Sequence, residues 1–351
     1  MLPATTVRNG PINEFIYLSE GNSNAFLIVT SEERIVINTG MGFEAPMHKA
    51  YFDSVDSGPV RYVIFTQGHV DHVGGSDLFV EEGTEVVAHA HNPAHQAEDA
   101  LIAGIRARRS YFAFAESISR ANVYIKEKLG GTASGQSRPT PTITFDEGFA
   151  FVLGGLEVEL ISTPGAETKD SLIVWLPQHG ICFTGNVFGA LFGHFPNLVT
   201  VRGDRYRDAL TYVATLEKIQ ALDPEMLCVG HHEPVRGREL IRSELARMRD
   251  AVLFVHDATV KGMNEGKDVF TLMREIKLPP EIEVGEGYGK ISWSVRAIWE
   301  NYIGWFHQHS TTELYPTPNW SVSPDLCELA GGPDVIAKAA RKKLESGAAV
   351  E

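Results

Sequence analysis

The sequence predicts an α/β fold in which two β-sheets pack face to face with helices outside them, an αββα sandwich, followed by a helical C-terminal extension. Short apolar runs rich in β-branched and aromatic residues form two groups, one before and one after a helical stretch at residues 93–130. From Gly237 onward, almost the whole chain has the apolar spacing of helices.

Each β-rich half is divided into short strands by turns that contain glycine, asparagine or serine. In the first half, strands are expected at residues 15–18, 25–29, 34–37, 60–65 and 85–89. In the second half, they are expected at residues 149–153, 156–161, 172–176, 180–185 and 226–229. Helices are expected at residues 45–54 and 206–222, and a glycine- and serine-rich loop at residues 130–139. We therefore expect a catalytic domain over residues 1–265 and a helical extension over residues 266–351.

Composition limits the classes of partner and the compartment. The net charge of −14 disfavours nucleic acid and anionic membranes, and an anionic substrate would need a local cation. The cysteines are Cys182, Cys228 and Cys327, which show no disulfide or metal-binding spacing. Residues 1–8 contain no apolar leader-like segment, and no run reaches membrane-spanning length. These observations favour a cytoplasmic protein.

The segment after the expected strand at residues 60–65 carries metal-binding side chains. His69, Asp71 and His72 lie within four residues and are followed by two glycines. A strand that ends in such a segment can bring nitrogen and oxygen ligands together in a small volume. This ligand set suits zinc or a similar divalent metal.

Further candidate ligands follow other expected strands. Glu167 and His231 each stand just after a β-rich run, and Asn186 follows Gly185 at the end of another. Each of these residues alone is more often a capping or solvated residue than a ligand. Four such groups at successive strand ends predict a metal site.

These motifs resemble the metallo-β-lactamase superfamily, whose signature is His-x-His-x-Asp-His, with Gln67 in place of its first His. Several segments resemble the alkylsulfatase branch in order along the chain. They are Arg108-Arg109-Ser110-Tyr111, Pro164-Gly165-Ala166-Glu167, Asn197-Leu198 with Arg202-Gly203 and Arg207-Asp208, Gly230-His231-His232-Glu233-Pro234, and residues 296–306.

The resemblance implies two neighbouring metal sites. His69 and Glu167 belong to the first, with Gln67 and Asn186 as further candidates, and Asp71, His72 and His231 belong to the second. The branch has a bridging carboxylate where this chain has Gly185, and two close cations need anionic ligands between them. We therefore expect one Zn²⁺ rather than two, with another divalent metal as an alternative. Asp71 and His231 are the expected catalytic residues.

The same resemblance implies a substrate site. Arg202 and His194 lie in the segment where the branch binds sulfate, and Asn197 and Tyr111 are weaker candidates. A guanidinium fits a tetrahedral oxyanion or a carboxylate with two hydrogen bonds. The alternative for Arg202 is a surface salt bridge.

We expect a metal-dependent hydrolase that uses metal-activated water on a small ester-like substrate, either a sulfate ester, a carboxylic ester or a lactone. The alternatives are a lyase or isomerase with a single Lewis-acidic ion, and a non-catalytic binding descendant of the fold. A helix after Pro333 has Val335, Ile336, Ala339 and Ala340 on one face. This helix resembles the dimerisation region of alkylsulfatases, so we expect a homodimer, with packing on its own domain as the alternative.

Overall fold

The computed structural model describes residues 8–131 and 135–348 of the chain. They divide into two compact units, one that ends at Asn301 and one that begins at Tyr302. The N-terminal segment 1–7, and part of the glycine-rich loop expected at residues 130–139, lie outside the described residues.

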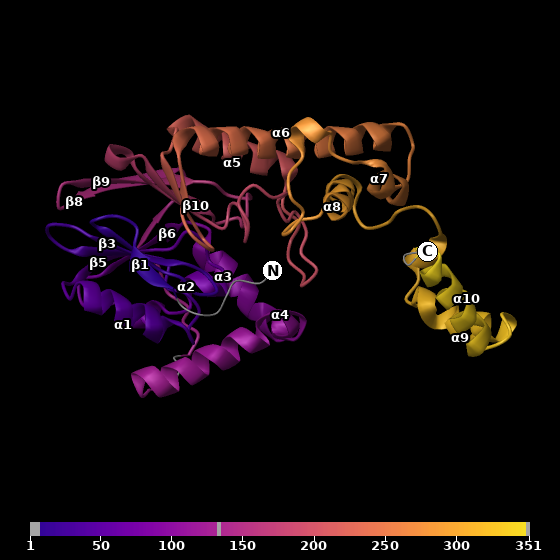
Figure 1. The fold of residues 1–351 in the computed structure, drawn as a ribbon, viewed down its shortest axis with the longest axis horizontal. Helices are drawn as coiled ribbons and strands as arrows, with labels where there is room; N and C mark the ends of the chain where they lie inside the picture. Colours follow the sequence, from indigo (N-terminus) through magenta and orange to yellow (C-terminus); the bar gives the residue numbers. More distant parts are fainter. Residues whose placement is uncertain (1–7, 132–134, 349–351) are drawn as a thin grey trace. The chain divides into compact units, whose positions relative to one another are not determined.

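The first unit contains two β-sheets (Figure 1). Within the described residues, the first sheet has the order β1-β2-β3-β4-β5-β6-β7, antiparallel from β1 to β4 and parallel from β4 to β7. Its strands are β1 (Asn9–Pro11), β2 (Ile16–Ser19), β3 (Ala25–Val29), β4 (Arg34–Ile37), β5 (Val60–Ile64), β6 (Glu85–His89) and β7 (Ile143–Phe145).

The second sheet has the order β13-β12-β11-β10-β9-β8 within the described residues. Only its β11–β12 pair is parallel. Its strands are β8 (Gly148–Leu153), β9 (Leu156–Ser162), β10 (Leu172–Leu176), β11 (Ile181–Gly185), β12 (Met226–Val229) and β13 (Val235–Arg236).

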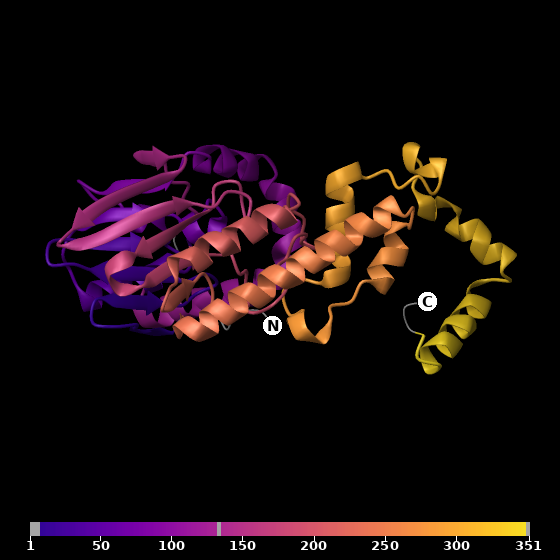
Figure 2. The same ribbon diagram turned by 90° about the horizontal axis from the view of Figure 1, so that it is seen from above.

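Helices cover the outer faces of the two sheets, as Figures 1 and 2 show. All the α-helices that begin in the first unit, whether or not they cover a sheet, are α1 (Ala45–Val55), α2 (Val70–Val73), α3 (Asn92–Leu101), α4 (Ala103–Tyr124), α5 (Ala209–Leu222), α6 (Arg238–Asn264), α7 (Val269–Glu275) and α8 (Ile291–Ile303). The second unit contains α9 (Ser323–Leu329) and α10 (Pro333–Glu345). Shorter helical turns are η1 (Ser76–Leu78), η2 (Ile125–Leu129), η3 (Pro177–His179), η4 (Pro280–Ile282), η5 (Thr311–Leu314) and η6 (Asn319–Val322).

Alternation along the strands separates three apolar layers. In β4, Ile35 and Ile37 face the core between the sheets, whereas Val36 faces the layer under α1. In β10, Leu172 enters the central core and Ile173 packs toward α5 and α6. Strands whose two faces are both buried are typical of a sheet sandwich covered by helices.

The expected fold class is confirmed. The short strands β1, β7 and β13 were not predicted, because runs of two or three residues carry no clear alternation. Helix α5 begins at Ala209 rather than Tyr206, because the Asp208 side chain accepts a hydrogen bond from Thr211 N–H and caps the helix. Among the described residues, no helix has the length and apolar character needed to span a bilayer.

Candidate functional site

The candidate site lies where ends of the two sheets meet. Leu172 N–H, at the start of β10, donates to Thr66 C=O just after β5 at 2.8 Å. Asn24 N–H donates to Gly230 C=O at 2.7 Å, and its side chain donates to Val229 C=O at 2.8 Å. Ser23 Oγ lies 3.2 Å from His72 Nδ1 and donates to Gly230 C=O at 3.3 Å, so the loop after β5 and the loop after β12 lie close together.

Asp71, His72 and His231 are close enough to influence one another's ionisation. Burial lowers the pKa of His72 to about 4 and also lowers the pKa of His231, so both imidazoles are neutral near pH 7. Burial acts to raise the pKa of Asp71, but His72, His69 and His231 outweigh it and lower that pKa. His72 Nε2 lies 3.8 Å from Asp71 Oδ2.

Two neutral imidazoles and one carboxylate are a donor set that fits one divalent cation. His231 Nδ1 is buried without a hydrogen-bond partner in the described structure, so its lone pair or proton is uncommitted. Among the residues the structure describes, no three His, Cys, Asp or Glu side chains already surround a common metal position. Binding therefore requires these side chains to turn toward one another.

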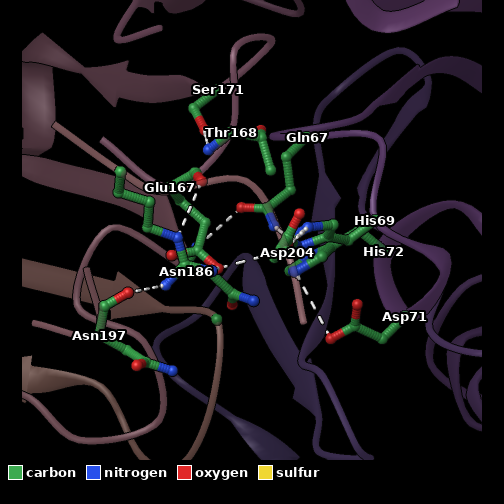
Figure 3. Close-up of polar contacts among 12 residues, drawn as sticks. Gln67, His69, Asp71, His72, Glu167, Thr168, Ser171, Asn186, Asn197 and Asp204 are labelled. Atoms are coloured by element: carbon green, nitrogen blue, oxygen red, sulfur yellow. Dashed lines mark hydrogen bonds and ion pairs between the residues drawn. The ribbon is translucent and has the colours of Figure 1, made fainter. Parts of the chain in front are cut away.

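The residues expected at the first metal site contact protein groups instead. His69 Nδ1 lies 2.6 Å from the side-chain nitrogen of Gln67, and His69 Nε2 lies 3.5 Å from Asp204 Oδ2 (Figure 3). Burial acts to lower the pKa of His69, but Asp204, Glu167 and Asp71 outweigh it and raise that pKa to about 9. Both ring nitrogens of His69 therefore face other side chains.

Glu167 forms a buried ion pair with Arg207. Arg207 Nη2 donates to Glu167 Oε1 at 2.7 Å, and the two side chains are 7% and 4% exposed. Arg207 Nε also donates to Glu167 C=O at 3.0 Å, and Nη1 donates to Asn197 C=O at 2.6 Å. The guanidinium thus neutralises the carboxylate that a first metal would need.

Gly185 leaves no room for a bridging carboxylate. Its φ is +51°, and a Cβ there would lie 2.5 Å from Thr66 Oγ1. Asn186 contributes its backbone N–H to the Gln67 side-chain oxygen at 3.3 Å, while its own Oδ1 is buried without a partner among the described residues. Gly185 and Asn186 therefore supply no carboxylate to the group of residues expected at the first metal site.

Arg202 is a cation without a carboxylate partner. No carboxylate of the described residues lies within 4.0 Å of its guanidinium, which lies 5.5 Å from the centre of the Phe114 ring. Burial is the main cause of the lowered pKa of His231, and the positive charge of Arg202 is a further, smaller influence in the same direction. The surface salt bridge that was the alternative role for Arg202 is therefore not formed with any of the described residues.

The other expected substrate residues lie in different surroundings. The Asn197 side-chain oxygen is buried without a hydrogen-bond partner among the described residues. His194 Nδ1 accepts from Gly287 N–H at 2.9 Å, so this ring supports the 285–289 loop. Tyr111 is 71% exposed on α4 and has no described partner at the site.

Three residues that the sequence did not indicate also belong to this region. The first is Asp204, which lies beside His69. The second is Arg106, which forms an ion pair with Asp204 at 3.0 Å. The third is Tyr288, whose hydroxyl hydrogen-bonds Arg207. They come from α4 and from two loops far apart in the chain, so spacing gave no signal. The sequence indicated Arg207 only as part of the Arg207-Asp208 segment and assigned no role to its side chain.

A buried carboxyl group lies beside this site at the start of α1. Glu44 is 3% exposed, and its Oε1 accepts from Asn22 N–H at 2.8 Å. Burial raises the pKa of Glu44 to about 8, and the charge of Asp71 also raises it. The backbone amides of Asn22 and Met41 act in the opposite direction and lower it. Neighbouring His48 is fully buried, and burial lowers its pKa to about 4.

We expect Glu44→Gln to remove part of the pH dependence of stability. Because the folded pKa of Glu44 lies above its unfolded value, the stability it contributes is present below about pH 4.5 and is lost as pH rises through 8. The variant should gain on the order of a few kcal/mol over the parent between pH 6.5 and 9. His48 titrates below this window. Urea unfolding at several pH values measures the difference, and parallel curves would show that Glu44 is not buried.

Comparison with known proteins identifies the families and relatives that this chain resembles. Residues 18–231 match the family described as the metallo-beta-lactamase superfamily, and residues 271–350 match the family described as alkyl sulfatase dimerisation. A linear primary-alkylsulfatase of Pseudomonas sp. (strain ATCC 19151) is 29% identical over 90% of this chain and 62% of its own length. The alkyl/aryl-sulfatase BDS1 of Saccharomyces cerevisiae is 25% identical over 93% of this chain and 53% of its own.

The fold is also found in a solved structure. A stereoselective inverting sec-alkylsulfatase from Pseudomonas sp. superposes with a TM-score of 0.81 and 23% identity, over 97% of this chain and 57% of that one. The chain thus spans a little more than half the length of these relatives. The resemblance seen in the sequence is confirmed: the chain belongs to the metallo-beta-lactamase superfamily, and its residues 271–350 match the alkyl sulfatase dimerisation family.

Proposed function

We propose that this protein is a metal-dependent hydrolase that acts on a small sulfate ester. The alkylsulfatase relatives and the hydrolase-type ligand set support the reaction class. The single observation that carries the substrate class is the uncommitted guanidinium of Arg202, whose charge reaches His231. In a chain with a net charge of −14, a local cation is what an anionic substrate requires.

The residues divide the work between binding and chemistry. Asp71, His72 and His231 would hold one divalent cation, zinc being the usual metal of this ligand set. Such a cation polarises a substrate oxygen and makes water more acidic. Asp71 keeps its negative charge and can orient a water molecule. Arg202 binds the anionic group of the ester with its planar fork.

We expect one tightly bound divalent ion per chain, because Arg207 and Asp204 occupy the groups of the first site. Glu167→Gln should leave that stoichiometry unchanged, whereas Asp71→Asn should abolish it. Elemental analysis after dialysis measures both variants beside the parent. Two ions in the parent, or loss of the ion in Glu167→Gln, would contradict this assignment.

A substrate panel tests the reaction class. It compares alkyl sulfates, carboxylic esters and lactones of matched chain length, with and without added zinc. Metal-dependent release of inorganic sulfate supports the proposal. Hydrolysis of only the neutral esters or lactones would contradict the sulfate-ester proposal and mean that Arg202 has another role. If the metal-loaded protein turns over no substrate of the panel, the protein is a binding protein rather than a hydrolase.

We also propose that the protein is a homodimer through its second unit. Neither α9 nor α10 has a buried residue, and apolar side chains remain exposed. The most exposed are Leu326, Leu329, Val335, Ile336 and Leu344. A match to a dimerisation family over these residues supports a second copy as their partner.

A further inference from the structure

The residue proposed to bind the anion lies on a tight turn. Gly203 N–H donates to Thr200 C=O at 3.0 Å, so residues 200–203 form a β-turn with Arg202 in its third position. The carbonyl groups of Val201 and Arg202 are not used by this turn. Without partners, the turn and its arginine would be free to shift.

Arg109 of α4 contacts both of these carbonyl groups. Its Nε donates to Arg202 C=O at 2.5 Å and its Nη2 donates to Val201 C=O at 2.8 Å. The guanidinium also lies against Gly203, which has φ +95° and where a Cβ would be 3.3 Å from Arg109 Nε. The fork of one arginine thus holds two successive peptide groups of the turn.

The same helix makes two more contacts with this segment. Arg106, one helical turn before Arg109, binds Asp204 at 3.0 Å. The Phe114 ring lies 5.5 Å from the Arg202 guanidinium, within the range of a cation–π interaction. Arg109 therefore binds the backbone of the turn, Phe114 contacts the Arg202 side chain, and Arg106 binds Asp204, the residue after the turn.

We propose that Arg109 is a positioning residue that fixes Arg202 for anion binding, so that α4 determines the affinity of the site for the charged group of the substrate. This inference rests on the proposed role of Arg202. Arg109 acts through the turn and does not touch the substrate. Its planar fork matters because a lysine ammonium cannot donate to both carbonyls with the same geometry.

The test uses the full-length protein with inorganic sulfate as the probe. The variants are Arg109→Ala, Arg109→Lys and Arg202→Ala, with Arg108→Ala as the matched control. Arg108 is the adjacent exposed arginine of the same helix and has no described polar partner. Calorimetry gives the Kd for sulfate, and hydrogen–deuterium exchange gives the protection of residues 200–204.

Loss of the two charge-assisted hydrogen bonds should weaken sulfate binding about tenfold in Arg109→Ala. Exchange in residues 200–204 should become faster in the same variant. Arg109→Lys should recover only part of both properties, and Arg108→Ala should match the parent. With a turnover substrate, KM should rise while kcat changes little.

The variants separate the anion-binding role of Arg202 from the positioning role of Arg109. If Arg202→Ala leaves the sulfate Kd unchanged, the anion-binding role of Arg202 is wrong, and so is the positioning role that depends on it. If Arg202→Ala weakens binding but Arg109→Ala changes neither Kd nor exchange, only the positioning role is overturned. An equal effect of Arg108→Ala would reduce the result to general electrostatics of α4 and would also overturn it.

Discussion

Replacing His231 with alanine is expected to abolish stoichiometric metal binding and to reduce activity by more than about a hundredfold. His231 and His72 are the two neutral imidazoles of the candidate site, and Asp71 supplies the carboxylate. A three-ligand site has no spare donor, so Asp71→Ala should have the same effect. Elemental analysis and turnover of the best substrate from the panel measure the two losses separately.

The neighbouring His232 provides the control for this prediction. Its side chain is 39% exposed and lies 3.7 Å from Glu20. Because its φ is +63°, asparagine is a better replacement than alanine. His232→Asn should keep metal content and keep activity within about twofold of the parent. Full activity in His231→Ala together with loss of activity in His232→Asn would mean that His232, and not His231, is the ligand.

Local sequence pattern was sufficient to predict the sheets. Strands such as β3, β4 and β10 are continuous apolar runs bounded by turns, and their limits agree with the expectation. Among the edge strands, β7 pairs with β6, which is distant in sequence, whereas β1 and β13 are very short strands that pair with their sequence neighbours β2 and β12. Their residues have no pattern of their own, so the chain could not reveal them.

The candidate site was predictable only where its residues follow strands. The candidate ligands His69, Asp71, His72 and His231 lie in the segments that follow β5 and β12, with Asp71 and His72 in the short helix α2. The pairing of Glu167 with Arg207 joins residues 40 apart, and that of Arg106 with Asp204 joins residues 98 apart. A residue's type shows that it can form an ion pair, but the tertiary fold decides with which partner.

These unpredicted pairs explain how the chain accommodates Gln67. The departure from the family signature removes a nitrogen ligand, and Gly185 removes a carboxylate. Glu167 is paired with the guanidinium of Arg207, and His69 is flanked by Asp204. We therefore expect the Glu167–Arg207 and His69–Asp204 pairs to contribute to folding stability in this chain.

Replacing Arg207 with methionine is expected to lower the free energy of unfolding by about 3–5 kcal/mol, the usual effect of breaking a buried ion pair on one side. The substitution removes donors to the Glu167 carboxylate, to Glu167 C=O and to Asn197 C=O. Burial already raises the pKa of Glu167, and Arg207 is the strongest influence that opposes it. Without the guanidinium, the carboxyl group must bind a proton or remain as an unpaired charge.

Urea unfolding measures this loss as a lower midpoint with an unchanged m-value. Arg238→Met is the matched control, because Arg238 forms ion pairs with Asp223 and Glu225 at the surface. It should lower the free energy of unfolding far less than Arg207→Met does, because exposed ion pairs contribute little to stability. The double variant Glu167→Gln with Arg207→Met should recover part of the loss, since no charge is then left buried. If Arg207→Met costs no more than Arg238→Met, Glu167 is not held by this arginine and remains available as a metal ligand.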